Sequence, residues 1–412
     1  MRILITSIVD LKRVPHNRIH VFADYLSRRH DVTALCLNAW WLARGDADDG
    51  GGEHSGDPYF RELFERARVH YLSERRDPPV LQEVTCLPRL NGVLRNIDLS
   101  RFDVHLNYGN LVAGYFVSRK AKPLGIPTVL DLADDLPQSF ARSPQVPPAL
   151  RPVAWLVARA MLKANVRLAS RVTFVTKALK DAYLLPDSKA ALIPNGYHAD
   201  LCAQSSNDSL REELGLGDAF VVGFVGNLLE WVDLDPAFSA LRTLASDGKD
   251  LRMLIVGGGE KLDQSVALAK AYGISDTVVF TNHVALARVP EYISCMDVCL
   301  VSRKPTTDSD RSLPVKLFEY MACQKPVISV PLVGVREAVG DRVLYASDSS
   351  ELVDRIERLY TDRILREELG SAGKAFVEQN YDWEHICARF EATLAEATKE
   401  YSASNSALGL AE

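Results

Sequence analysis

Short apolar runs rich in β-branched residues recur along the chain, and segments with helical periodicity separate them. Gly, Pro, Asn or Asp bounds most of these runs. Continuous apolar strands that alternate with helices are typical of parallel sheets covered on both faces. The pattern predicts strands at 3–9, 31–37, 103–106, 128–132 and 171–175, and then at 220–225, 252–256, 277–280, 298–301 and 326–330.

The pattern stops and restarts around ALIPNGYHADLCAQSSNDSLREELGLG (191–217). A stretch this rich in Asn, Ser, Asp and Gly is typical of a domain boundary. We therefore predict an α/β protein with two Rossmann-like, doubly wound parallel-sheet domains, at 1–195 and 205–380. Ligands of such sheets bind outside the carboxyl ends of the strands, so we expect the domains to face a central cleft that holds the site. A Gly/Asp-rich segment at 43–57 is predicted to be a mobile loop.

Composition and charge narrow the class of protein. The chain has 412 residues, a net charge of −6 and no overall basic field, so nucleic acid is not an expected partner. Its seven scattered cysteines form no CxxC pair, which is typical of reduced core thiols and not of a zinc site. The first apolar run is too short to span a membrane and lacks a signal-peptide cleavage pattern. We expect a cytoplasmic protein.

Three predicted strands of the second half end in glycine or polar residues. These ends are Gly226-Asn227, the glycines at 257–259, and Asn282-His283. Glycine after a strand lets a ligand approach the backbone closely, and exposed N–H groups suit a diphosphate. A simple turn explains each end taken alone, but three at one sheet edge favour a nucleotide-type site. None is a G-x-G-x-x-G or Walker A loop.

A fourth strand end leads into RSLPVKLFEYMACQKPVISV (311–330). We expect a helix to begin near Pro314, because proline is favoured in the first turn. Lys316 in that first turn opposes the helix dipole, which a bound anion would offset. Glu319, one turn further on, has acceptor oxygens suited to a pair of sugar hydroxyls. The alternative is a solvated loop with a surface glutamate. The loop before the helix carries three more cations, Arg303, Lys304 and Arg311.

Six segments, in this order and spacing, resemble the retaining GT-B glycosyltransferases of family four. They are IPNG (193–196), VVGFVGN (221–227), LRMLIVGGG (251–259), VVFTNHV (278–284), LPVKLFEYMACQKPVIS (313–329) and YDW (381–383). The LFEYMA-x-x-KPVIS part is the most specific. The resemblance covers both halves and implies a GT-B fold, a nucleotide-sugar donor, a hydroxyl acceptor and no metal or other cofactor.

The resemblance also assigns roles to residues. Glu319 would bind the ribose hydroxyls, the backbone at 313–315 would cradle the donor sugar and phosphates, and the turn at 282–284 would hold the base. The YDW segment would begin a helix, at about 383–400, that crosses back onto the first domain, with Trp383 as a packing anchor. The predicted donor site comprises Gly226, Asn227, Asn282, His283, Val284, Arg303, Leu313, Pro314, Val315, Lys316 and Glu319.

The sequence departs from the family pattern at the phosphates. Arg311 stands where many members have a second glutamate, and Asn227 and Trp231 stand where many have an Arg and a Lys that neutralise the diphosphate. The phosphate partners then remain among Arg303, Lys304, Arg311 and Lys316, and we favour Lys316 with one arginine. The GNLLEW variant resembles a bacterial branch that acts on cell-surface polysaccharides or secondary metabolites.

The first domain is expected to hold the acceptor. Its loop at 10–22 lacks the paired glycines usual in the family and offers other polar residues. We predict catalytic roles for His16 and Asp134, with a structural His16 as the alternative. Of the adjacent Asp134 and Asp135, one is expected to bind a hydroxyl and the other to cap a helix. The predicted acceptor-binding residues are Arg13, Asn17 and Arg18.

A cationic stripe, Arg159, Lys163 and Arg167, marks the predicted helix at 151–171. A solvated face explains it, and contact with the inner membrane surface is the alternative. Taken together, the sequence predicts transfer of a sugar from a UDP-, GDP- or dTDP-linked donor to a hydroxyl acceptor. The family resemblance implies that the reaction retains the anomeric configuration. The alternatives are another GT-B nucleotide-sugar enzyme, such as an epimerase, and a non-catalytic GT-B binding subunit.

Overall fold

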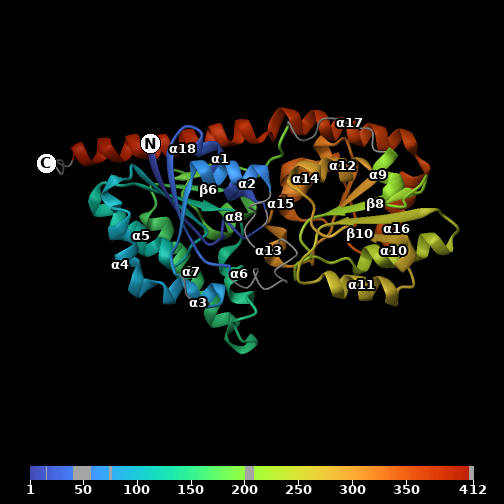
Figure 1. The fold of residues 1–412 in the computed structure, drawn as a ribbon, viewed down its shortest axis with the longest axis horizontal. Coiled ribbons are helices and arrows are strands. Elements are labelled where there is room, and N and C mark those ends of the chain that lie inside the picture. Colours follow the sequence, from blue (N-terminus) through green and yellow to red (C-terminus); the bar gives the residue numbers. More distant parts are fainter. Residues whose placement is uncertain (15, 40–56, 74–76, 200–207, 408–412) are drawn as a thin grey trace. The chain divides into compact units, whose positions relative to one another are not determined.

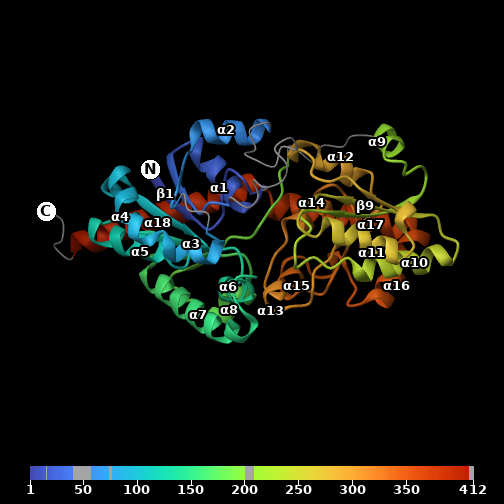
Figure 2. The same ribbon diagram turned by 60° about the horizontal axis from the view of Figure 1, so that its bottom comes forward.

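The computed structural model describes the chain except residues 15, 40–56, 74–76, 200–207 and 408–412. The predicted loop at 43–57 therefore lies almost entirely outside the described residues. The chain forms two compact units: unit 1 is Met1–Pro194 with Glu384–Glu412, and unit 2 is Asn195–Trp383. Figures 1 and 2 show in each unit a sheet covered by helices on both faces. The predicted α/β class with two parallel sheets is confirmed.

Unit 1 is built on a seven-stranded parallel sheet of order β3-β2-β1-β4-β5-β6-β7. The order reverses between β1 and β4, which is the Rossmann switch point. Its strands are β1 (Arg2–Ser7), β2 (Asp31–Cys36), β3 (Arg68–Tyr71), β4 (Val104–Tyr108), β5 (Thr128–Leu132), β6 (Arg171–Phe174) and β7 (Ala190–Leu192). Its helices are α1 (Arg18–Ser27), α2 (Pro58–Arg66), α3 (Pro79–Thr85), α4 (Leu87–Asn96), α5 (Ala113–Ala121), α6 (Leu136–Arg142), α7 (Arg151–Leu168), α8 (Lys177–Tyr183) and α18 (Trp383–Ala407).

Unit 2 repeats this topology with six parallel strands in the order β10-β9-β8-β11-β12-β13, so its switch point lies between β8 and β11. Its strands are β8 (Phe220–Val225), β9 (Leu251–Val256), β10 (Val278–Phe280), β11 (Val298–Val301), β12 (Val327–Ser329) and β13 (Leu344–Tyr345). Its helices are α9 (Asp208–Glu213), α10 (Asp235–Ser246), α11 (Leu262–Ala271), α12 (Val289–Ser294), α13 (Thr307–Asp310), α14 (Val315–Ala322), α15 (Val333–Val339), α16 (Ser349–Thr361) and α17 (Arg363–Asn380).

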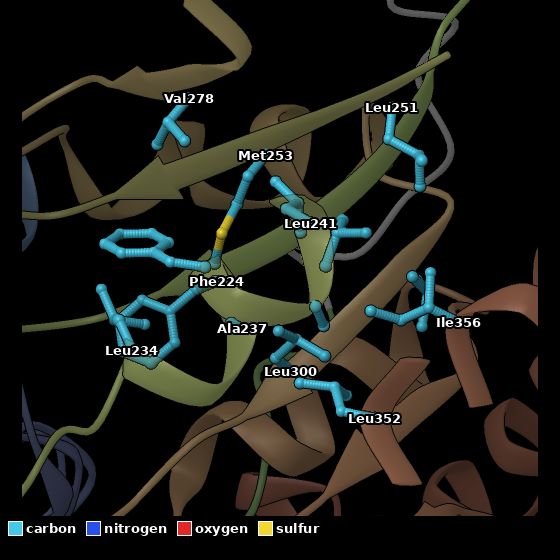
Figure 3. Packing of buried hydrophobic residues seen from close by; sticks show 14 of the residues in the cluster. Phe224, Leu234, Ala237, Leu241, Leu251, Met253, Val278, Leu300, Leu352 and Ile356 are labelled. Atoms are coloured by element: carbon cyan, nitrogen blue, oxygen red, sulfur yellow. The ribbon is translucent and has the colours of Figure 1, made fainter. Parts of the chain in front are cut away.

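Side chains from the strands and helices interlock in the core of unit 2. Phe224, Met253 and Leu300 project from three neighbouring strands and are almost completely buried. Leu241 of α10 and Ile356 of α16 pack against the same face of the sheet (Figure 3). Apolar burial of this kind stabilises by about 25 cal/mol per Å², so the covered sheet is a rigid base for the loops at its carboxyl edge.

Helix α18 belongs to unit 1 although it follows unit 2 in the sequence. Phe390 stacks on Phe22 of α1 with ring centroids 4.0 Å apart. His30 Nε2 lies 2.6 Å from the Glu391 carboxylate, and Arg171 of β6 pairs with Glu400. The helix begins at Trp383, which is buried, and runs to Ala407, past the expected end near 400. None of the helices in the described part of the chain combines the length and hydrophobicity needed to cross a bilayer.

A buried ion pair joins α1 to the centre of the unit 1 sheet. The Arg18 guanidinium donates two hydrogen bonds to the Asp131 carboxylate of β5, at 2.9 and 3.0 Å, and both side chains are almost fully buried. Thr173 of β6 also donates to Asp131. Arg18 donates further to the Pro194 carbonyl, at 2.7 Å. The pair therefore fixes α1, β5 and the last residue of unit 1 against one another.

Loss of one member of this pair should leave the other charge buried without its partner. We expect Arg18→Ala to lower the free energy of unfolding by about 3–5 kcal/mol. The matched control is Arg2→Ala, because Arg2 pairs with Asp103 on the surface of the same unit, where solvent screens an ion pair and little stability is lost with it. Urea unfolding followed by circular dichroism measures both, and equal losses would contradict the role given to the buried pair.

Candidate donor site in unit 2

The loops after β8, β9 and β10 meet at the carboxyl edge of the unit 2 sheet. The Gly226 amide donates to the Val256 carbonyl at 2.8 Å, and the Gly257 amide donates to the Asn282 carbonyl at 2.9 Å. The Leu228 amide donates to the Gly258 carbonyl at 2.7 Å. The three glycine- or Asn-containing ends that the sequence singles out therefore form one hydrogen-bonded surface.

Glycine is required at this surface for two reasons. Gly226 and Gly257 have φ angles of +129° and +130°, which side-chain-bearing residues rarely adopt. A Cβ on Gly257 would overlap the Gly226 carbonyl oxygen, and a Cβ on Gly226 would lie 2.6 Å from Lys316 Nζ. Asn282, which follows β10, has a φ of +62°, and asparagine tolerates this left-handed conformation better than most residues.

Helix α14 faces the same edge from across the switch point. Pro314 is its N-cap, and Leu317, Phe318, Tyr320 and Met321 bury one side of the helix in unit 2. The Tyr320 hydroxyl accepts a hydrogen bond from the Val225 amide at 2.7 Å. This contact ties the helix to the last residue of β8, directly before Gly226.

Lys316 extends from the first turn of α14 toward the end of β8. Its Nζ lies 3.8 Å from the ring centroid of Phe224, a geometry that favours the cation electrostatically. Burial, and secondarily the charge of Arg303, lowers the pKa of Lys316 to about 7, while Glu319 acts in the opposite direction. Lys316 is therefore only partly protonated near neutral pH, and a bound anion would stabilise its charged form.

Glu319 is half-buried one turn further along α14. Burial raises its pKa to about 7, and the ammonium of Lys316 partly offsets that effect. The two side chains thus form a coupled pair in which each stabilises the charge of the other. A carboxylate in this position can accept hydrogen bonds from vicinal hydroxyls.

Cations from the end of β11 complete this edge of unit 2. Arg303 donates a hydrogen bond to Ser312 Oγ, and its guanidinium lies 5.9 Å from the ring centroid of Trp231. The Lys304 amide donates to the Trp231 carbonyl at 2.9 Å. Trp231 stands where the family resemblance implies a lysine, and the fold brings the cationic loop at 303–304 against that residue.

A further contact that sequence reasoning missed holds the loops together. Glu230 accepts from Lys304 at 2.7 Å and from Lys261 at 2.6 Å, and these two hydrogen bonds lower the pKa of Glu230 to about 2. One carboxylate therefore bridges the loops after β8, β9 and β11. Neither lysine is a free cation, so Arg303 and Lys316 are the better candidates for binding a diphosphate.

Two sequence motifs meet in space at the loop before α14. Asn195, the third residue of IPNG, donates through its side-chain amide to the Leu313 carbonyl at 2.6 Å. Leu313 is buried, and Pro314 and Val315 are half-buried.

The other predicted donor residues differ in exposure. Asn227 and Val284 are half-buried, while Asn282 and His283 are exposed next to Gly258. Arg311, the departure from the family pattern, follows α13 and is half-buried.

The predicted acceptor residues of unit 1 lie after β1, at the carboxyl edge of its sheet. Arg13 donates to Asp10 at 3.2 Å, to Asn38 at 3.0 Å and to the Tyr71 hydroxyl at 2.8 Å. Asp10 is buried and also accepts from the Ala39 amide. Arg13 is thus held in a network that spans the ends of β1, β2 and β3, and its acceptor role remains a prediction.

The two predicted catalytic residues have different surroundings. His16 is half-buried in an aromatic cluster, with its ring centroid 5.1 Å from that of Tyr59, and this favours the structural alternative. Asp134 is exposed after β5. Its neighbour Asp135 caps α6 by accepting from the Gln138 amide, as expected for one member of the pair. Asp134 is therefore the better candidate for contact with an acceptor.

Two of the predicted acceptor residues have structural roles in unit 1. Asn17 caps α1 by accepting from the Ile19 amide in a capping box with His20. Arg18 is buried in its pair with Asp131, so its side chain does not face solvent. The prediction of Arg18 as an acceptor ligand is replaced by a structural role, because a guanidinium needs a carboxylate partner when it is buried.

The described residues contain no group of three or more His, Cys, Asp or Glu side chains arranged to hold a metal ion. The six cysteines described form no disulfide, and five of them are buried.

The two units match two parts of one enzyme family. Residues 206–376 match glycosyl transferases group 1, and residues 15–196 match the glycosyl transferase 4-like domain. The chain belongs to the GT-B glycosyltransferases of group 1.

Curated relatives are about a quarter identical to this chain over the segments that align. One is a GDP-mannose-dependent alpha-(1-6)-phosphatidylinositol monomannoside mannosyltransferase of Mycolicibacterium smegmatis, 27% identical over 58% of this chain and 65% of its own length. Another is an alpha-D-kanosaminyltransferase of Streptomyces kanamyceticus, 23% identical over 63% of this chain and 68% of that relative. The chain thus matches about two thirds of the length of these relatives.

Solved structures share the fold over nearly the whole chain. The structure of Anabaena HepE in complex with UDP and glucose has a TM-score of 0.71 and 20% identity, with 96% of this chain and 99% of that chain covered. Sucrose-phosphate synthase from Thermosynechococcus elongatus has a TM-score of 0.72 and 19% identity, with 96% and 98% covered.

Because the turns after β8 and β9 approach each other closely, a single added methyl group should strongly destabilise the fold. We expect Gly257→Ala to lower the free energy of unfolding by more than the roughly 1–3 kcal/mol of the unfavourable φ alone, because its Cβ also overlaps the Gly226 carbonyl. Gly248→Ala is the control, since Gly248 has a φ of +78° but no atom within 4 Å of the added Cβ. Urea unfolding compares the two, and equal costs would contradict the packing argument.

Proposed function

We propose that the protein is a nucleotide-sugar-dependent glycosyltransferase that moves a sugar, with retention, from a UDP-, GDP- or dTDP-linked donor to a hydroxyl acceptor. The observation that carries the proposal is the pairing of Lys316 and Glu319 on α14, directly opposite the Gly226 turn at the switch point of unit 2. A cation beside an accessible backbone turn suits a phosphate, and a carboxylate one turn away suits a ribose.

The donor would be held by unit 2 in three parts. Glu319 would accept hydrogen bonds from the ribose hydroxyls, and the turn at 282–284 would contact the base through its main chain. Lys316, Arg303 and the first amides of α14 would bind the diphosphate. As the glycosidic bond breaks, negative charge grows on the leaving diphosphate, and these groups would stabilise it without a metal.

The acceptor is proposed to bind unit 1, at the carboxyl edge that carries Arg13 and Asp134. Exposed carboxylates such as Asp134 can accept a hydrogen bond from a sugar hydroxyl and orient it. The matched relatives include enzymes named for phosphatidylinositol mannoside and kanosamine transfer. We propose an acceptor from cell-surface polysaccharide or secondary-metabolite biosynthesis, and a cytoplasmic site of action.

Loss of the Glu319 carboxylate should weaken donor binding. A thermal-shift screen with UDP, GDP, dTDP and ADP first identifies the preferred base. We then expect Glu319→Ala to weaken the binding of that nucleotide at least tenfold in calorimetry, because hydrogen bonds to a charged group contribute about 1.5–3 kcal/mol each.

The control is Glu368→Ala, which removes an exposed carboxylate from α17 in the same unit. Unchanged nucleotide affinity in Glu319→Ala would refute the ribose role. Turnover of a nucleotide sugar without any acceptor would instead favour the epimerase alternative.

The depressed pKa of Lys316 predicts proton uptake on nucleotide binding. At pH 8, above its pKa of about 7, most Lys316 side chains are neutral in the free protein. A diphosphate beside the amine stabilises its charged form, so binding should raise this pKa and take up close to one proton. Glu319, with a pKa of about 7, is already largely ionised at pH 8 and contributes little.

Calorimetry in buffers of different ionisation enthalpy measures this uptake. Lys316→Arg keeps the positive charge but cannot lose its proton, so we expect it to bind nucleotide without proton uptake. Uptake that is absent from the wild type, or equal in Lys316→Arg, would refute the contact between Lys316 and the diphosphate.

A further inference from the structure

The outward face of α7 has an unusual combination of side chains for a helix at the surface of unit 1. Val153, Leu156, Ala160, Lys163 and Arg167 follow one another at steps of three and four residues, so they form one stripe along the helix, and all five are exposed. The opposite side, with Ala158, Leu162 and Asn165, is buried in unit 1. The exposed stripe is therefore apolar in its first half and cationic in its second half.

Further apolar side chains broaden the first half of this stripe. Leu150, just before the helix, and Val157 are more than half exposed, as are Val153 and Leu156. Trp155 is half-buried beside them, with the Arg159 guanidinium 5.2 Å from its ring centroid. Water contact with four neighbouring large aliphatic side chains is unfavourable, and clusters of this kind mark interaction sites.

The segment of the chain that contains α7 carries charged side chains of one sign only. No Asp or Glu occurs among the 45 residues from Leu136 to Lys180, whereas eight Lys or Arg do, in a chain whose net charge is −6. On α7 itself these are Arg151, Arg159, Lys163 and Arg167, which are exposed. Among the described residues, none of these four side chains has an ion-pair partner. The patch thus offers uncompensated positive charge next to exposed aliphatic groups.

We propose that this α7 patch, defined as Leu150, Val153, Leu156 and Val157 with Arg151, Arg159, Lys163 and Arg167, binds the surface of an anionic membrane. Anionic headgroups would neutralise the cations, and the aliphatic side chains would enter the boundary between headgroups and acyl chains. A second copy of the chain does not fit as the occupant, because two such patches would bring like charges together. Nucleic acid would leave the aliphatic side chains in water.

Vesicle binding tests this proposal without reference to enzymatic activity. The full chain is mixed with vesicles of phosphatidylcholine alone, or of phosphatidylcholine with phosphatidylglycerol, and the bound fraction is measured by sedimentation. We expect binding to the anionic vesicles, weakened by salt, and little binding to the neutral vesicles. Equal binding to both kinds of vesicle, or no binding to either, would overturn the proposal.

Two sets of variants separate the charge from the apolar contact. Removing Arg159, Lys163 and Arg167 together by alanine substitution should weaken binding at least tenfold, since each cation at an anionic surface contributes about a factor of five. The matched control replaces three exposed cations of unit 2, Arg242, Lys270 and Arg358, by alanine and should bind as the wild type does.

The apolar half of the patch is tested with Leu156→Ser combined with Val157→Ser, which leaves the charge unchanged. We expect this variant to lose vesicle binding, whereas Val266→Ser with Ile364→Ser, at exposed aliphatic positions of α11 and α17, should keep it. Circular dichroism checks that each variant is folded. Loss of binding in the charge variant alone would overturn the entry of the aliphatic side chains into the membrane and leave a purely electrostatic contact.

Discussion

The candidate donor site depends on how closely two backbone segments approach each other after β8 and β9. At Gly226 and Gly257 the chains are so near that a Cβ on the second glycine would overlap the carbonyl oxygen of the first. Side-chain-bearing residues would separate the two turns, and the hydrogen bonds to Val256 and Asn282 would lengthen or break. Removing side chains here also leaves space that the amine of Lys316 occupies. The positions of the cation and of the turn therefore follow from one steric constraint.

Electrostatic coupling then determines what this space can bind. Burial disfavours the charged forms of both Lys316 and Glu319, and each offsets part of that cost for the other. Arg303 adds a second positive charge, which repels the ammonium of Lys316 and lowers its pKa further. Such a site is short of negative charge, which a diphosphate would supply. Glu230 has the opposite effect at the outer edge, where it neutralises Lys261 and Lys304 and keeps the loops in place.

Much of the fold can be predicted from the sequence, because central parallel strands must be apolar on both faces. The strands at 128–132, 220–225 and 298–301 were predicted with their observed bounds. The edge strands β3, β7 and β13 were missed, since a strand with one neighbour needs no continuous apolar run. In the site, the glycine turns and cations follow from local motifs. The contacts from Tyr320 to Val225 and from Asn195 to Leu313 join residues 95 and 118 positions apart, and no local pattern encodes them.

The membership of α18 in unit 1 has a consequence for how the protein is made. Phe390 stacks on Phe22, and Glu391 and Glu400 pair with residues of the N-terminal half, so unit 1 lacks one of its covering helices until α18 is synthesised. All of unit 2 leaves the ribosome before that helix does. Unit 2 can fold as soon as it has emerged, whereas the folding of unit 1 is completed only when Phe390 of α18 packs on Phe22. The half of the chain translated first is therefore the last to be completed.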